Sequence, residues 1–239
     1  MKKIALFLLG VVFIVTVSGC AELDKMAKNL DATFKTGAVD NTIAGLKEAL
    51  SVATVNAVLD VSRINGYLKN QAIKILLPDE IQKTMNLARK IGLGGLVDSF
   101  EESMNQAAEK AAPQARAIFL DAVRNITFDD ALKILKGGDT AATDFLKSKT
   151  YHTIHAAFQP LIARSMAQVG VTRLYQQVVG PVQALPFQKP VTLDLDAYVT
   201  GKALDGLYFV VAEEEKKIRT DPSARVTALL KEVFGKKKR

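Results

Sequence analysis

The chain has 239 residues, a formal net charge of +7, one cysteine, two histidines and no tryptophan. This length is sufficient for one sizeable domain with its own hydrophobic core. A single cysteine excludes an internal disulfide and a zinc site built from several thiolates. The basic residues form no broad basic face, because four of them stand together in the C-terminal tail Lys236–Arg239. We therefore expect no nucleic-acid partner.

The N-terminus has the layout of an export signal. Two lysines precede an uncharged run over residues 4–17, which leads through small residues to Cys20. A helix of about 14 residues is ~21 Å long, whereas a bilayer core is ~30 Å thick, so the run is too short for a comfortable permanent span. The ending Val-Ser-Gly-Cys at residues 17–20 resembles a bacterial lipobox. That resemblance implies cleavage before Cys20 and a diacylglycerol on its sulfur.

We expect Cys20 to anchor the protein to a membrane through acyl chains such as palmitate. Each buried methylene contributes about 0.8 kcal/mol, and stable anchoring takes two or more chains. A simple cleaved signal and an uncleaved anchor are the alternatives. Ala21 follows the cysteine, where aspartate would commonly signal retention in the inner membrane. If the host has two membranes, we expect the protein on the inner face of the outer one, facing the periplasm.

The sequence predicts four segments: a signal peptide at 1–19, a tether with a short amphipathic helix at 20–40, a helical domain at 41–235 and a basic tail at 236–239. The amphipathic helix has apolar residues at helical spacing and ends at Gly37 in this interpretation. It either lies on the bilayer surface or packs on the body. The basic tail is either a frayed terminus or a segment that attracts anionic lipid headgroups.

The predicted fold is all-α, a single bundle-like domain of roughly 8–10 helices. A broad apolar stripe from Ile43 to Leu59 predicts a central, largely buried helix that ends at Asn65-Gly66. Further helices are predicted at 78–92, at 96–111 and from Pro113. Two later helices are predicted to end at Gly137-Gly138 and at Gly170. A brief alternation at 191–195 is too short for a sheet. The longest irregular stretch, 180–192, is predicted as a connector loop.

Several residues predict how the helices begin and end. Thr127 and Asp130 resemble a capping box. Gly137-Gly138 are expected to adopt positive φ and stop one helix, and Asp139 is expected to cap the next. Asp221-Pro222 combines a cap with a proline at the first helical position.

Residues that could carry chemistry are few. His152 and His155 share a helix face and could form half of a metal site, but two ligands do not complete one, so an ordinary polar face is preferred. No phosphate loop and no G-x-S-x-G motif is present. The charges at 213–219 pair at i, i+4, as Glu213 with Lys217 and Glu215 with Arg219, and predict a solvated helix face rather than a cation site. We predict no catalytic residue, no metal and no cofactor.

Many short motifs, in order, resemble a bacterial family known as domain of unknown function 4197. They include Ser103-Met104-Asn105, Gly137-Gly138-Asp139, Ala141-Ala142-Thr143, Val169-Gly170-Val171-Thr172, Tyr198-Val199-Thr200, Lys202-Ala203-Leu204-Asp205-Gly206-Leu207, Ala212-Glu213-Glu214-Glu215 and Val233-Phe234-Gly235. The resemblance covers most of the chain from about Leu46 to Phe234. It implies an all-helical fold, often with an export or lipoprotein signal, and it brings no activity.

We expect a non-enzymatic, membrane-anchored binding or structural component of the cell envelope, with an envelope protein or a lipid as partner. A carrier of apolar ligands or lipids is an alternative, and it requires an internal apolar pocket. A carboxylate- or metal-dependent hydrolase is another, and it requires carboxylates from separate helices to converge. The candidate binding residues are polar ones within the apolar stretches that resemble the family: Arg173, Tyr175, Tyr198, Lys202 and Asp205. Packing, and an ion pair between Arg173 and Asp205, would explain them equally.

Overall fold

The computed structural model describes residues 19–168, 170–184, 194–225, 227 and 231. The predicted basic tail and all but the last residue of the predicted signal lie outside these residues, as does most of the predicted connector at 180–192. The chain divides into two compact units, Met1–Ala44 and Gly45–Arg239, and each is described by itself.

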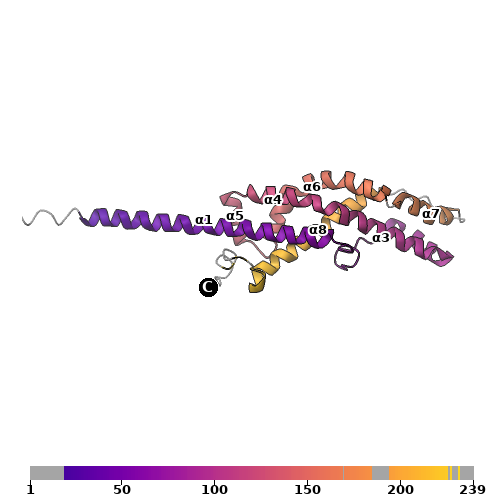
Figure 1. Ribbon diagram of the computed structural model, residues 1–239, viewed down its shortest axis with the longest axis horizontal. Coiled ribbons are helices and arrows are strands. Elements are labelled where there is room, and N and C mark those ends of the chain that lie inside the picture. The colour runs from indigo at the N-terminus through magenta and orange to yellow at the C-terminus, as the bar shows by residue number, and fades with distance from the viewer. Residues whose placement is uncertain (1–18, 169, 185–193, 226, 228–230, 232–239) are drawn as a thin grey trace, which may run out of the picture. The chain divides into compact units, whose positions relative to one another are not determined.

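Helix α1 covers Gly19–Ser62 without interruption (Figure 1). The expected end at Gly37 is therefore wrong. A glycine inside a helix costs only about 1 kcal/mol relative to alanine, which neighbouring helix-forming residues can outweigh. The helix ends near the predicted place, because Asn65 adopts a positive φ of 63° in the turn that follows.

Within the second unit, α1 contributes a buried stripe to the core, as predicted, but Leu59 on the expected broad face is 57% exposed. Its buried residues are at most 4% exposed, namely Leu46, Ala49, Leu50, Ala53, Ala57, Val58 and Val61. By length and composition alone, the part Asn41–Ser62 also passes as a candidate membrane span. A buried core helix passes the same test, and the packing of this stripe accounts for its apolar character.

The other elements confirm the all-α prediction, and the described residues contain no strand. The helices are α2 (Asp79–Ala88), α3 (Gly94–Ala111), α4 (Ala115–Arg124), α5 (Phe128–Lys136), α6 (Ala141–Gln168), α7 (Val171–Gln183) and α8 (Leu195–Thr220). A kink at Arg89–Leu93 separates α2 from α3, because Ile91 is not helical and Gly92 adopts a positive φ of 89°. Short 3₁₀ turns occupy Ala112–Gln114 and Pro222–Ala224.

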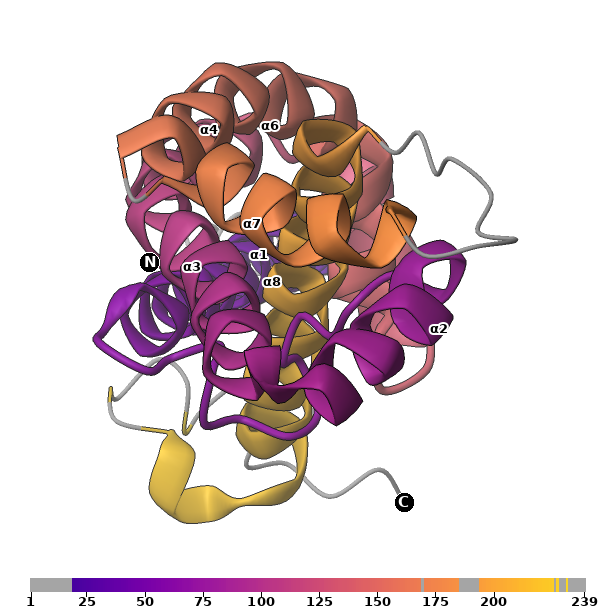
Figure 2. The ribbon, with the colours of Figure 1, turned by 90° about the vertical axis from the view of Figure 1, so that its right-hand side faces the viewer.

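Helix α8 lies along the middle of these helices, with α3 and α6 beside it (Figure 2). It is buried on several sides, from Val199 to Ile218. Small side chains permit close approach where α3 leads into α4, because Ala107, Ala108, Ala111, Ala112 and Ala115 are fully buried.

The structure tests the predicted helix ends one by one. The capping box of Thr127 and Asp130 is confirmed on both of its hydrogen bonds. Gly137 ends α5 in an extended conformation, at φ −76° and ψ 178°, so the expected positive φ is wrong. Glycine is needed there for space, because a Cβ would lie 2.4 Å from the Cβ of Ala141.

Two further differences concern α6 and α7. Asp139 does not cap α6, because the backbone N–H groups of Ala142 and Thr143 donate to the carboxylate of Glu215. Helix α7 continues through Pro181 to Gln183, so the irregular stretch begins later than predicted. The buried valines of its last turns, Val178, Val179 and Val182, fix this end of the helix although proline lacks an N–H donor.

Candidate functional site

A polar groove lies where the segment before α2 passes the start of α8, and we call it the Tyr198 groove. It has a volume of about 290 Å³ and is lined by Lys74, Leu76, Leu77, Asp79, Glu80, Gln82, Tyr198 and Lys202. Two of the five sequence candidates for binding, Tyr198 and Lys202, are among these residues. The groove is therefore the candidate functional site.

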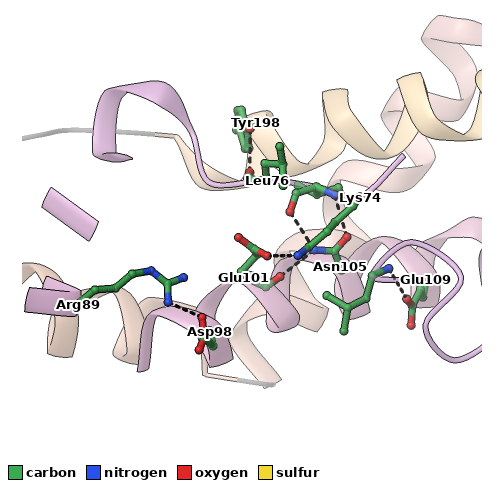
Figure 3. A network of polar contacts seen from close by, with 10 residues as sticks. Lys74, Leu76, Arg89, Asp98, Glu101, Asn105, Glu109 and Tyr198 are labelled. Atoms are coloured by element: carbon green, nitrogen blue, oxygen red, sulfur yellow. Dashed lines mark hydrogen bonds and ion pairs between the residues drawn. The ribbon is translucent and has the colours of Figure 1, made fainter. Parts of the chain in front are cut away.

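One wall of the groove is a segment without regular secondary structure, residues 74–78, and α3 fixes it. The amide of Asn105 accepts the N–H of Ile75 at 2.8 Å and donates to the carbonyl of the same residue at 2.9 Å. Lys74 forms an ion pair with Glu101, one turn earlier on α3, at 2.5 Å. Figure 3 shows both contacts reaching from α3 to this wall.

The chain leading to this wall is fixed by a buried carboxylate. Glu109, only 7% exposed, accepts the backbone N–H groups of Asn65, Tyr67 and Leu68 at 3.2, 3.1 and 3.4 Å. Hydrogen bonds to a charged acceptor are stronger than neutral ones, so one side chain orders a whole turn.

Tyr67 attaches the same turn to α8. Its ring is fully buried, and its hydroxyl donates to the carbonyl of Ala203 at 2.7 Å. Burial raises the pKa of this phenol, and the charge of Glu109 raises it further. Gly206 leaves room for the contact, because a Cβ there would lie 2.8 Å from the Tyr67 ring and 3.0 Å from Ile73.

Tyr198 connects the two sides of the groove. Its hydroxyl donates to the carbonyl of Leu76 at 3.0 Å, as Figure 3 shows. The ammonium of Lys202, one turn along α8, lies 5.9 Å from the centre of the Tyr198 ring, within the range of a cation–π contact. Partial burial raises the pKa of Tyr198, and the carboxylates of Asp79 and Glu80 raise it further.

This arrangement favours binding of charged groups. The described residues that line the groove include no Ser, Cys or His, and the one phenol is held neutral at ordinary pH. Lysines and carboxylates border the same space, so the groove presents charges of both signs.

The remaining three candidates lie elsewhere. Arg173 on α7 and Asp205 on α8 are exposed, and no ion pair joins them in the part of the chain that the structure describes. Tyr175 is half-buried and packs on the ring of Phe100, with 5.8 Å between centroids. The backbone of Cys20 lies in the first turn of α1.

The two histidines pack around Tyr151. Ring centroids are 5.7 Å apart for Tyr151 and His152 and 6.1 Å apart for Tyr151 and His155. No group of three or more His, Cys, Asp or Glu residues among the described positions is arranged to hold a metal ion.

The prediction of a solvated face at 213–219 is wrong for its central residues. Glu215 is 4% exposed and bonds Arg219 at 2.7 Å, so the predicted pair forms but is largely buried. Glu214 is also buried, accepts a hydrogen bond from Asn56 and pairs with Lys217 in place of Glu213. Because α8 is buried on several sides, its core-facing surface includes Glu214 and Glu215, although charged residues are usually exposed to solvent.

An apolar-lined cavity between α1 and α8, bordered by Leu46, Leu50 and Ile218, has a volume of about 10 Å³. That is about the space of one water molecule and far below the ≈300 Å³ of a small ligand pocket. This cavity gives the carrier alternative no support.

Sequence reasoning missed the residues that build the groove wall, namely Lys74, Asn105 and Glu109. A signal for two of them is present, because Asn105 and Glu109 stand at i, i+4 among the alanines and Met104 of the buried face of α3. Polar residues in such a stripe must find partners, and here the partners are backbone groups of residues 65–75.

The fold and the groove define a class of protein: an all-α domain with a charged surface groove. Residues 37–235 match the family described as a protein of unknown function, DUF4197, and the chain belongs to that family. Searches of curated proteins and of solved structures found no match.

Proposed function

We propose that this protein is an exported lipoprotein, tethered to a membrane through Cys20, whose helical domain binds a partner in the cell envelope. The observation that carries the tether is the sequence Val-Ser-Gly-Cys at residues 17–20, directly after an uncharged run with two lysines before it. If the host has two membranes, Ala21, in place of the aspartate that signals inner-membrane retention, favours the inner face of the outer one.

The binding role rests on the groove and on the packing of the core. A wall held by Asn105, Glu109 and Tyr67 is a preorganised surface, and preorganisation lowers the entropic cost of binding. The groove brings charges of both signs together, and its described lining residues include no Ser, Cys or His. These features favour recognition over catalysis.

Acylation and fractionation test the tether. In cells fed labelled palmitate, the wild-type protein should carry the label and sediment with membranes. Cys20→Ser should lose the label and move to the soluble fraction, because no acyl chain remains to partition into the bilayer. Ala21→Ser, which keeps the cysteine, is the matched control. Unchanged membrane partitioning of Cys20→Ser would overturn the proposal.

Affinity isolation tests the binding role. The protein is isolated from native membranes in a non-ionic detergent, and co-purifying proteins and lipids are identified by mass spectrometry. The proposal expects a partner that is retained by the wild type and depleted by Lys202→Gln. A set of co-purifying molecules identical for both would contradict the assignment of binding to the groove.

A further inference from the structure

Opposite charges line the Tyr198 groove without pairing with each other. The ammonium of Lys202 and the carboxylate of Glu80 are both exposed, and neither takes part in an ion pair with another described residue. Lys74 differs, because Glu101 neutralises it at 2.5 Å. Asp79, which also lines the groove, is in no ion pair with another described residue either, so the groove keeps the ammonium of Lys202 apart from two carboxylates.

Tyr198 shows that both charges face one space. Its ring lies 5.9 Å from the ammonium of Lys202, on α8. Asp79 and Glu80, at the start of α2, line the same groove as Tyr198 and Lys202, and their charges raise the pKa of the Tyr198 phenol. The hydrogen bond from the Tyr198 hydroxyl to the carbonyl of Leu76 fixes the ring against the wall of the groove.

We propose that the Tyr198 groove binds a small zwitterion, whose anionic group contacts Lys202 and whose ammonium contacts Glu80 and Asp79. This inference rests on the binding role proposed above but not on acylation of Cys20. A ligand of this chemistry bridges two charges that the protein leaves unpaired, and a neutral or singly charged ligand satisfies at most one of them. The volume of about 290 Å³ suits a short peptide or a phosphoethanolamine group.

The groove is open to solvent, so the expected affinity is modest. Removal of one exposed charge should weaken binding about two- to fivefold, which corresponds to roughly 0.4–1 kcal/mol. The specificity pattern, rather than tight binding, is the expected signature.

Ligand-observed NMR on the full chain, in a non-ionic detergent, provides the test. The probes are trialanine, which carries both charges, N-acetyl-trialanine, which keeps only the anion, and trialanine amide, which keeps only the cation. O-phosphoethanolamine is the fourth probe and distinguishes a headgroup source from a peptide source. Whichever zwitterion binds more tightly identifies the source.

The proposal expects a zwitterion to bind more tightly than both singly charged analogues by about two- to fivefold. Equal binding of the three trialanine probes together with no binding of phosphoethanolamine would overturn it, as would the absence of binding by either zwitterion. Because the assay uses purified protein, its failure leaves the acylation experiment on Cys20 unaffected.

Four variants locate the binding. Lys202→Gln should weaken the binding of the probes that carry an anion, and Glu80→Gln should weaken the binding of the probes that carry an ammonium. Each effect should be about two- to fivefold. Lys216→Gln and Glu213→Gln are the matched controls, because both residues are exposed on α8 and neither lines the groove. All four positions are exposed, so the fold should persist, and circular dichroism verifies it. Equal effects of the groove and control variants would refute the assignment.

Discussion

Glu109 on α3 and Glu215 on α8 are both buried carboxylates, but different partners stabilise their negative charges. Both are nearly inaccessible, at 7% and 4% exposure, and both accept backbone N–H groups from another segment. Glu215 is also neutralised by Arg219 at 2.7 Å. Glu109 takes part in no ion pair with another described residue and relies on three N–H donors.

The difference has a consequence for function. At Glu215 the carboxylate caps a regular helix, α6, and holds the core together. At Glu109 the carboxylate orders an irregular turn, and that turn leads into the wall of the Tyr198 groove. A buried charge without a cation can thus position a segment that no regular hydrogen-bond ladder supports.

The largest expected effect is at Glu215. Replacing it by alanine should lower the free energy of unfolding by about 3–5 kcal/mol, because the change leaves Arg219 without its anion and two N–H groups of α6 without an acceptor. Urea unfolding of Glu213→Ala, an exposed neighbour, should differ from wild type by at most about 0.5 kcal/mol. Equal stabilities for the two variants would show that the carboxylate is not a structural group.

A smaller effect is expected at Glu109. Glu109→Ala should cost about 2–3 kcal/mol, because it leaves the N–H groups of Asn65, Tyr67 and Leu68 without their acceptor but leaves no buried cation. Urea unfolding measures this loss of stability, with Lys110→Ala, at the exposed neighbour on α3, as the control. A loss as large as that of Glu215→Ala would remove the distinction between the two sites.

Two glycines on α8 should respond with opposite signs. Gly206→Ala places a Cβ against Tyr67 and should destabilise by about 1 kcal/mol net, since overpacking outweighs the gain in helix propensity. Gly201→Ala meets open space and should stabilise by about 0.5–1 kcal/mol. Thermal unfolding of both variants provides the comparison, and the same sign for both would contradict the close packing of Tyr67 on α8.

The smallest effect at neutral pH is expected at the buried phenols. Burial raises the pKa of Tyr67, and raises that of Tyr208 to about 12. The unfolded phenols ionise near pH 10, so the folded state binds more protons above that pH. Ionisation of these groups should therefore leave the free energy of unfolding unchanged below about pH 10 and lower it as the pH rises above that value.

Tyr67→Phe tests this dependence. It should lose about 1 kcal/mol at pH 7, from the bond to Ala203, and show a shallower decline above pH 10. Urea unfolding at several pH values measures both quantities. An unchanged alkaline slope would show that Tyr67 is not the buried acid described above.

Much of the fold is readable from the sequence. Helical spacing and glycine or proline punctuation predict the all-α architecture, the core stripe of α1 and the capping box at Thr127. Rules based on neighbouring residues fail where a contact from another helix caps a helix end or limits the space for a side chain. Glu215 replaces the expected cap Asp139, and close approach of Ala141 rather than positive φ explains Gly137.

The site was predictable only in part. Tyr198 and Lys202 stand out as polar residues in apolar surroundings, and both line the groove. Its other wall comes from residues 74–82, more than 100 positions earlier, and sequence spacing carries no information on that pairing. Arg173, Tyr175 and Asp205 gave the same sequence signal but lie elsewhere, because exposure and packing depend on neighbours that only the fold supplies.

The central claim is that side chains of α3 fix both the groove wall, residues 74–78, and the turn at residues 65–68 that leads to it. Hydrogen–deuterium exchange of the full chain tests it most directly, because the N–H groups of Tyr67 and Ile75 donate to Glu109 and Asn105. The account predicts slow exchange at both, with Asn105→Ala accelerating exchange at Ile75 and leaving Tyr67 protected. Exchange at both positions as fast as in an unfolded peptide would contradict it.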